Sequence, residues 1–269
     1  MYRTISIQKR YEGFLNTSYL WHNNAVFDLK QFEISSKTNK INIAIDEQLR
    51  LGKYVERLVS FELEQQAGIS IIAENIQIQK DKTTLGELDC LLLRDNTPIH
   101  LEVIYKFYLF DDSAGNSEIE HFIGPNRKDS LIEKLNKLKD KQLPLLFSDV
   151  CKPYLEELGL QTSSITQYVY FKAQLFLPFS NQNRTLNTLN TSCISGYYLN
   201  KKQLLQLIDC KFHIPNKKDW LVIPYTDIDW LNFDDFIFNT KDYLAKEVSI
   251  LSWVKFKNGE IKKMFLVWW

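Results

Sequence analysis

Residues 85–110 have the sequence LGELDCLLLRDNTPIHLEVIYKFYLF, which predicts two β-strands joined by a turn. Residues 85–94 and 99–110 are rich in Leu, Ile, Val, Tyr and Phe, which are typical of strands. The intervening Asp-Asn-Thr-Pro is typical of a turn. We therefore expect a β-hairpin at the centre of the fold.

One face of this hairpin carries ionisable side chains. Side chains alternate between faces along a strand, so Glu87 and Asp89 share one side of the first strand. On the second strand, the corresponding side carries His100, Glu102 and Lys106, while the other side is wholly apolar. Charged groups in buried strands are costly unless they meet partners or a metal ion. The polar face is therefore the candidate functional site.

Composition predicts a globular protein without a strong bulk charge. The chain has 269 residues, of which 45% are apolar and 13% aromatic, enough for a sizeable core. Lys plus Arg and Asp plus Glu number 33 each, so any binding to nucleic acid needs a local basic patch. The N-terminus lacks the apolar region of a signal peptide, and no run is long enough to span a membrane. We expect a cytoplasmic protein without membrane association.

Several common site types have no sequence signature here. The chain has no Walker loop, GxGxxG, HExxH or GxSxG motif. Its cysteines are far apart in sequence, without a CxxC pair, so reduced core thiols are expected rather than disulfides or zinc ligands. These cysteines are Cys90, Cys151, Cys193 and Cys210.

Helical spacing predicts a helix over residues 46–67, with Asp46 available at its start and Gly68 just past its end. Glu56 lies along an otherwise apolar row of this helix, so its carboxylate should face other protein or a site. A second helix is expected over residues 127–143, starting near Asn126 and stopping before Pro144. It carries a local density of lysines, including Lys134.

The remaining pattern alternates strands with helices. Strands are expected at 69–79 and 167–179, and a further helix near 240–250 after an acidic loop, WLNFDDF. The last two strands, SWVKFK and KKMFLVWW, are joined through Asn258-Gly259, a strong hairpin signal. No linker is evident, which favours a single α/β or α+β domain over 1–269 with a C-terminal elaboration.

The order of these features resembles the PD-(D/E)XK nuclease superfamily over about residues 46–180. The matching features are a helix with Glu56, the motif GELD ending in Asp89, and HLEV containing Glu102. More narrowly, GELDCLLL, HLEVIYKFYL, FIGPNRKDSL and KLNKLKDKQLP are similar to the bacterial domain-of-unknown-function family 1853, which has been grouped with these nucleases. The resemblance implies a restriction-endonuclease-like αβββαβ core, a mixed central sheet flanked by helices, with an elaboration over about 181–269.

The resemblance also implies a metal-dependent chemistry. Asp89 and Glu102, with the Val103 carbonyl as a third ligand, would hold Mg²⁺ or Mn²⁺, since hard cations take oxygen ligands. Lys106 would orient the attacking water or stabilise the transition state, and Glu56 would hold a metal-bound water or a second ion. The superfamily usually places its lysine where this chain has Ile104. Position 106 points to the same side, about 7 Å further along the strand.

We therefore expect a Mg²⁺-dependent nuclease that hydrolyses phosphodiester bonds in DNA, with RNA as the other possible substrate. Gln142, His100 and Lys134 are weaker candidates for contacts with substrate or phosphate. Two alternatives stay open: a protein that kept the fold, lost turnover and binds nucleic acid or a protein partner, and an interaction module without a nucleic-acid role. At the level of residues, Glu102 and Lys106 could instead form a buried ion pair, with Asp89 a turn or cap residue.

Overall fold

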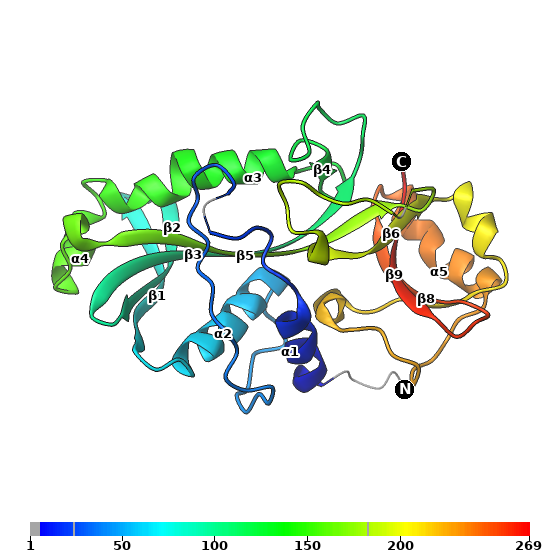
Figure 1. Cartoon of the computed structure of the whole chain (residues 1–269), viewed down its shortest axis with the longest axis horizontal. Coiled ribbons are helices and arrows are strands. Elements are labelled where there is room, and N and C mark those ends of the chain that lie inside the picture. The colour runs from blue at the N-terminus through cyan, green and yellow to red at the C-terminus, as the bar shows by residue number, and fades with distance from the viewer. Residues whose placement is uncertain (1–5, 24, 182) are drawn as a thin grey trace. The chain divides into compact units, whose positions relative to one another are not determined.

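A computed structural model describes residues 6–23, 25–181 and 183–269, and the chain divides into two compact units. Unit 1 comprises the described part of Met1–Ser18 together with Lys106–Ile132 and Ala173–Trp269. Unit 2 comprises Tyr19–Tyr105 and Glu133–Lys172, again in its described part. Both units combine strands with helices (Figure 1), which confirms the expected mixed α/β class. The restriction-endonuclease-like assignment, and the division into a core and an elaboration, stay predictions.

Unit 2 is built around the predicted hairpin. Strand β2 pairs with β3 in antiparallel register, with Leu91 opposite His100. The turn residues Asp95 and Asn96 both have positive φ, at 49° and 63°, which is the two-residue turn that suits the twist of paired strands. In unit 2 the strands lie in the order β1, β2, β3, β5, and helix α2 contacts β1. The elements are α2 (Leu51–Glu64), β1 (Ile69–Lys80), β2 (Thr83–Arg94), β3 (Thr97–Phe110), α4 (Lys152–Glu157), the 3-10 helix η3 (Thr162–Ser164) and β5 (Thr166–Pro178).

Apolar side chains of this hairpin pack on the segment that follows it. Leu88 and Leu91 belong to a buried cluster with Leu146 and Leu155. Figure 1 shows helix α2 along one side of the strands and the helical segment of residues 133–147 along the other. The hairpin therefore lies between helical segments.

The first predicted helix is shorter than expected. Helix α2 begins at Leu51, not Asp46, and its N-cap residue, Arg50, makes no side-chain cap hydrogen bond. Asp46 instead accepts a hydrogen bond from the backbone of Gln48 at 2.8 Å, which forms a separate turn before the helix. The expected row is otherwise retained, because Val59 and Leu63 are buried.

The helix expected over 127–143 was wrong at both ends. Its start is a turn in which Arg127 has φ 56°, and the side chain of Asn126 accepts from the backbone of Ser249 at 2.8 Å. Helix α3 begins only at Leu131. Pro144 does not end the helical segment, because it occupies the first turn of a 3-10 helix. The elements are α3 (Leu131–Lys137), the π-helix η1 (Leu138–Gln142) and the 3-10 helix η2 (Leu143–Phe147).

Unit 1 contains a mixed sheet. Its strand order is β5, β6, β9, β8, β7, in which β6 is parallel to β5 and β9, while β8 is antiparallel to β7 and β9. The ends of β3 and β5 belong to this unit, and β4 pairs with β3. The expected C-terminal hairpin is confirmed, with Gly259 at φ 87° in its turn. The strands are β4 (Phe122–Ile123), β6 (Ile194–Asn200), β7 (Lys211–His213), β8 (Ile250–Lys255) and β9 (Ile261–Val267).

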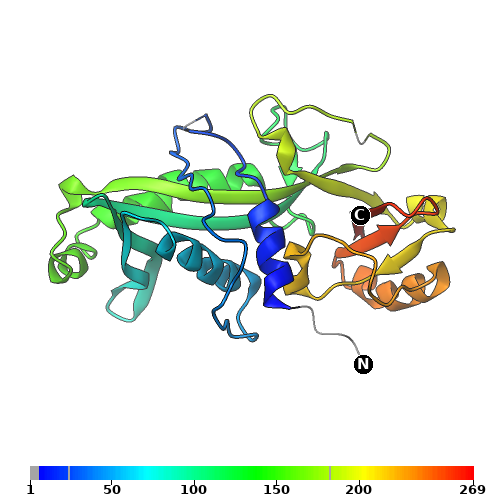
Figure 2. The ribbon, with the colours of Figure 1, turned by 60° about the horizontal axis from the view of Figure 1, so that its bottom comes forward.

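Helices complete unit 1. Helix α5 packs its Phe233 and Phe236 into a core with Met264. Figure 2 shows this helix beside the C-terminal strands. The expected helix near 240–250 was misplaced, because the acidic stretch read as a loop is the start of α5: Asn232 caps it, accepting from the backbone of Asp235 at 2.9 Å. The helices are α1 (Ile7–Asn16), α5 (Phe233–Ala245), and the 3-10 helices η4 (Thr191–Cys193), η5 (Gln203–Leu207) and η6 (Lys217–Leu221).

Two further expectations concern cysteines and membranes. All four cysteines are free and buried, as predicted. Within the described residues, we find no helix with the length and apolar character that crossing a membrane requires.

Candidate carboxylate centre

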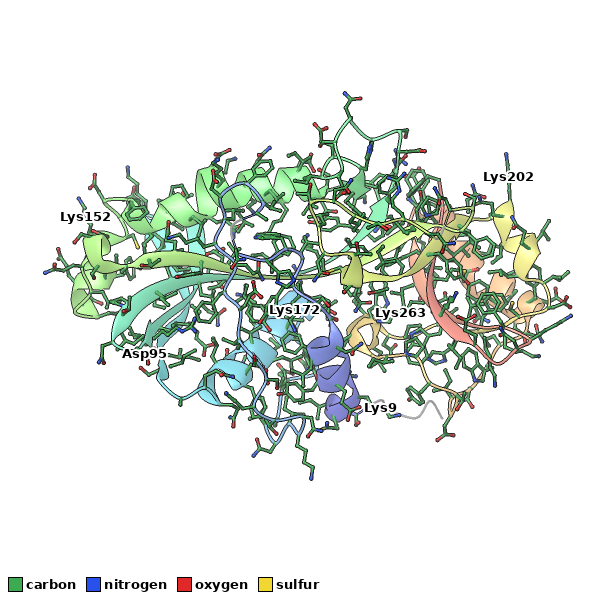
Figure 3. All side chains as sticks on the ribbon, in the orientation of Figure 1. Lys9, Asp95, Lys152, Lys172, Lys202 and Lys263 are labelled. Atoms are coloured by element: carbon green, nitrogen blue, oxygen red, sulfur yellow. The ribbon has the colours of Figure 1, made fainter. Side chains whose placement is uncertain are left out.

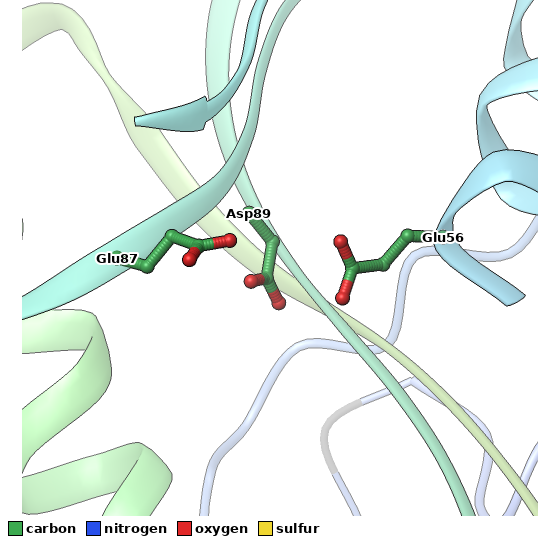
Figure 4. A group of neighbouring side chains, drawn as sticks. All are labelled: Glu56, Glu87 and Asp89. Carbon is green, nitrogen blue, oxygen red and sulfur yellow. The ribbon is translucent and has the colours of Figure 1, made fainter. Parts of the chain in front are cut away.

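Three carboxylates from two elements converge in unit 2. Glu56 projects from α2, while Glu87 and Asp89 project from β2 (Figure 4), and one oxygen from each lies within 4.8 Å of the others. Helix α2 is fixed against β1 by hydrogen bonds to Glu74, one of them from Arg57 at 3.1 Å. Side chains two residues apart on β2 share a face, so the pair Glu87 and Asp89 meets Glu56 at this surface.

A lysine on the same helix compensates this cluster. Lys53 lies one helical turn before Glu56 and donates to its Oε2 at 2.8 Å. The Lys53 ammonium also contacts Glu87 Oε1 and donates to Asn75 Oδ1 at 2.7 Å. Burial disfavours the charged ammonium, but the contacts with Glu56 and Glu87 outweigh it, so the pKa of Lys53 is raised.

Asp89 sits in an environment that opposes its charge. Its Oδ2 accepts a hydrogen bond from the Val103 backbone at 2.9 Å, which favours the carboxylate. Burial acts more strongly in the other direction, and the neighbouring charges of Glu102 and Glu56 add to it, so the pKa of Asp89 is raised to about 7. Burial likewise raises the pKa of Glu56. The cluster therefore holds more negative charge than its surroundings compensate.

Glu102 and His100 are fully buried members of a hydrogen-bond chain. Glu102 Oε1 is 3.1 Å from His100 Nε2, and Glu102 Oε2 accepts from Gln142 Nε2 at 2.6 Å. Gln142 in turn accepts from Lys134 Nζ at 2.7 Å. Both oxygens of this carboxylate are thus held by protein, and the three residues expected as substrate contacts all belong to the chain that holds it.

Gln167 fixes the orientation of the His100 ring at the other end of this hydrogen-bond chain. Gln167 Nε2 lies 2.9 Å from His100 Nδ1 and donates to the Leu143 carbonyl at 2.6 Å. Acceptance of the amide proton at Nδ1 leaves Nε2 as the ring N–H that donates to Glu102. Gln142 ends the π-helix η1, a type of turn frequent at functional sites.

Lys106 pairs with an aspartate. It belongs to unit 1, where its Nζ donates to Asp129 Oδ2 at 2.8 Å. Both side chains are partly exposed, at 37% and 46%. Instead of the buried Glu102–Lys106 ion pair left open as an alternative, Glu102 pairs with Gln142 and His100, and Lys106 pairs with Asp129.

The sequence profile of the family described as Domain of unknown function (DUF1853) matches residues 13–264. The chain belongs to the DUF1853 family. The match confirms the resemblance to family 1853. Membership of the PD-(D/E)XK nuclease superfamily stays a prediction. No curated protein and no solved structure matches the chain.

Three residues of this site in the DUF1853 chain were missed or undervalued from sequence. Lys53 was not predicted as a site residue. It precedes Glu56 by three residues on the same helix, a spacing that brings side chains together. Glu87 was placed on the correct face but given no role. Gln167 lies about 60 residues beyond the hairpin, and only the pairing of strands brings it to His100.

Proposed function

We propose that the carboxylate centre of unit 2 binds a divalent metal ion and that the protein is a metal-dependent phosphodiesterase acting on nucleic acid, with DNA as the preferred substrate. The observation that carries this proposal is the convergence of Glu56, Glu87 and Asp89. Two of these positions, Glu56 and Asp89, are those that the nuclease resemblance implies. Glu87 takes the place expected for Glu102 as the neighbour of Asp89 in the cluster.

The donor chemistry of the cluster fits Mg²⁺ or Mn²⁺. All three side chains offer carboxylate oxygens, the ligands that hard cations prefer, and none offers sulfur or imidazole. The Lys53 ammonium already compensates these carboxylates, which supports a site suited to positive charge. Glu56, Glu87 and Asp89 would hold the ion. When bound, such an ion supplies Lewis acidity that activates water and neutralises charge on a phosphate.

The chain's own residues would position the substrate and the water. Lys53 is 41% exposed, so its ammonium can turn from the carboxylates towards a phosphate oxygen. This gives the centre a lysine from helix α2 in the role expected of Lys106. The buried Glu102, held by Gln142 and His100, lies close enough to Asp89 to help raise the pKa of that carboxyl.

Metal titration tests the proposal directly. Adding Mn²⁺ or Mg²⁺ to the wild-type protein should release heat and raise Tm, because an ion that binds only the folded state stabilises it. The double variant Glu87→Gln, Asp89→Asn should show neither response. Asp149→Asn, which removes an exposed carboxylate outside the cluster, is the matched control and should respond as wild type does. Equal responses in all three proteins would refute the metal site.

Cleavage is measured separately. Wild-type protein with Mn²⁺ should release products from duplex, branched or single-stranded DNA, and the double variant should not. RNA of the same sequence serves as the comparison substrate.

Lys53→Met should lower the stability of the metal-free protein and increase the rise in Tm that Mn²⁺ causes. In EDTA we expect this variant to be less stable by about 1 kcal/mol, because the partly buried carboxylates of Glu56 and Glu87 lose their shared cation. Mn²⁺ should then raise its Tm by more than it raises that of wild type, since the ion no longer competes with the ammonium. A thermal-shift titration measures both effects, and a smaller Mn²⁺ response in Lys53→Met than in wild type would contradict them.

A second candidate function is a nuclease-like protein that binds nucleic acid or a protein partner without cleaving it. It is favoured by the engagement of both Glu102 oxygens by Gln142 and His100, and by the pairing of Lys106 with Asp129. For nucleic acid, this candidate predicts salt-dependent DNA binding with no product in the presence of Mn²⁺. Binding and cleavage measured on the same DNA separate it from the first.

A further inference from the structure

We propose that unit 1 contains a second ligand site, for a small phosphate-bearing molecule, in a cavity whose wall includes Lys106, Lys128 and Lys217. The cavity has a volume of about 1160 Å³ and lies wholly within unit 1. This exceeds the usual range of small-molecule sites, so there is room for a ligand larger than a phosphate ion. The proposal does not depend on the carboxylate centre of unit 2.

The lysines of this wall come from three separate segments. Lys106 lies on β3, Lys128 on the turn before α3, and Lys217 begins the 3-10 helix η6. Four aspartates also line the cavity. Asp129 pairs with Lys106, and Asp219 pairs with the buried Arg10 at 2.7 Å.

Lys217 is a cation of this wall that has no acidic partner among the described residues. Its Nζ lies 3.2 Å from the centroid of the Trp220 ring and 5.9 Å from that of Phe107. Within the described parts of the chain, no carboxylate oxygen lies within ion-pair distance of it. Burial, and then the charge of Lys106, lower the pKa of Lys217 to about 8, with Asp129 acting weakly in the other direction. An anion beside Lys217 would relieve this unfavourable environment.

The wall behind Lys217 is fixed in place. The Lys263 ammonium, which Figure 3 labels, donates to the Trp220 carbonyl at 2.6 Å and to Gln174 Oε1 at 2.7 Å. The Arg10–Asp219 pair anchors the same 3-10 helix from another side. A preformed wall reduces the ordering cost of binding, which favours a specific site over a loose charged surface.

The rest of the cavity indicates what the phosphate could carry. Trp220 and Phe107 present aromatic surface beside Lys217, and Asp227 and Asp229 bring carboxylate acceptors from a separate loop. A phosphate ester with a planar group and hydrogen-bond donors matches this combination, and adenosine monophosphate is a suitable probe. Free inorganic phosphate would use the lysines alone.

Calorimetric titration of the full chain in EDTA tests the site, because EDTA removes any contribution of the carboxylate centre. Adenosine monophosphate should bind at pH 7, and Lys217→Met should weaken it about tenfold or more, as expected for loss of a charge-assisted contact. Lys217→Arg should retain binding within about threefold of wild type. Lys202→Met, a change outside the cavity wall, is the control and should bind as wild type does.

Binding of adenosine monophosphate, inorganic phosphate and adenosine is compared to identify the chemical group that the site recognises. Tighter binding of adenosine monophosphate than of inorganic phosphate assigns the site to a phosphate ester, and equal binding assigns it to free phosphate. Binding should weaken between pH 7 and pH 9, because Lys217 loses its proton in that interval. Adenosine binding as tightly as its monophosphate, no binding to wild type, or unchanged binding by a folded Lys217→Met protein would each overturn the proposal.

Discussion

Asp89→Asn should raise the Tm of the metal-free protein. The substitution keeps the size of the side chain and its capacity to accept from the Val103 N–H, but removes a charge that burial and the neighbouring Glu102 oppose. Taking the raised pKa of about 7 against the ordinary 3.8, the free energy of unfolding at pH 8 should increase by a few kcal/mol, to order of magnitude. Loss of stability at a functional site is a common cost of placing charges together.

The contribution of Asp89 to the free energy of unfolding depends on pH. Because the folded pKa lies above the unfolded value, the folded chain holds the Asp89 proton more tightly between pH 4 and pH 7. The free energy of unfolding of wild type should therefore fall as pH rises through that interval, and the whole penalty is present above pH 7. The gain from Asp89→Asn should be smaller at pH 5 than at pH 8, by roughly 3 kcal/mol.

Denaturant unfolding in EDTA at the two pH values measures both effects. Asp149→Asn serves as control, because this aspartate is exposed and pairs only with the neighbouring Lys152. An Asp89→Asn protein that is less stable than wild type at pH 8 would mean that the carboxylate is well compensated in the metal-free state. The stability result is independent of whether the metal-bound protein cleaves DNA.

Arg10→Met should destabilise the protein by about 3–5 kcal/mol, the usual cost of leaving one member of a buried ion pair alone. Arg10 is 4% exposed and Asp219 is 2% exposed, and the guanidinium Nε donates to Asp219 Oδ1 at 2.7 Å. The pair joins helix α1 to the 3-10 helix η6 in unit 1. The two segments touch closely there, since a Cβ on Gly13 would lie 2.0 Å from the Leu221 carbonyl oxygen.

The double variant Arg10→Met, Asp219→Leu should recover much of that loss, because replacing both members removes the uncompensated charge. Lys152→Met, which breaks an exposed pair with Asp149, is the matched control and should change Tm little. Thermal unfolding followed by circular dichroism measures all three variants. A similar small shift for Arg10→Met and Lys152→Met would show that the buried pair contributes little to stability.

Local patterns were sufficient to predict the hairpin and most strands. Alternation of apolar residues and the turn at Asp95-Asn96 depend on neighbours in sequence, and the structure retains both. Helix boundaries were harder, because tertiary contacts decide them. The turn that precedes α3 is held by a hydrogen bond between Asn126 and Ser249, which lies more than 100 residues away in sequence. The residues near Asn126 in sequence do not indicate this contact.

The candidate site was predicted in its residue types more than in its pairings. Glu56 and Asp89 do come together, because helical and strand periodicity place each on the correct face. The pairing of Glu102 with Gln142 and His100, rather than with Lys106, depends on the π-helical turn that carries Gln142. A sequence pattern that fits an α-helix does not distinguish that wider turn, which changes where the glutamine amide points.

The position of β9 bears on how unit 1 can be made. This strand, Ile261–Val267, lies between β6 and β8, although both precede it in the chain. During synthesis the ribosome must therefore deliver residues up to 267 before that sheet can close, and until then β6 and β8 each expose an unpaired edge. Unit 1 should consequently be the late-folding part of the chain, and the one most dependent on chaperones while translation continues.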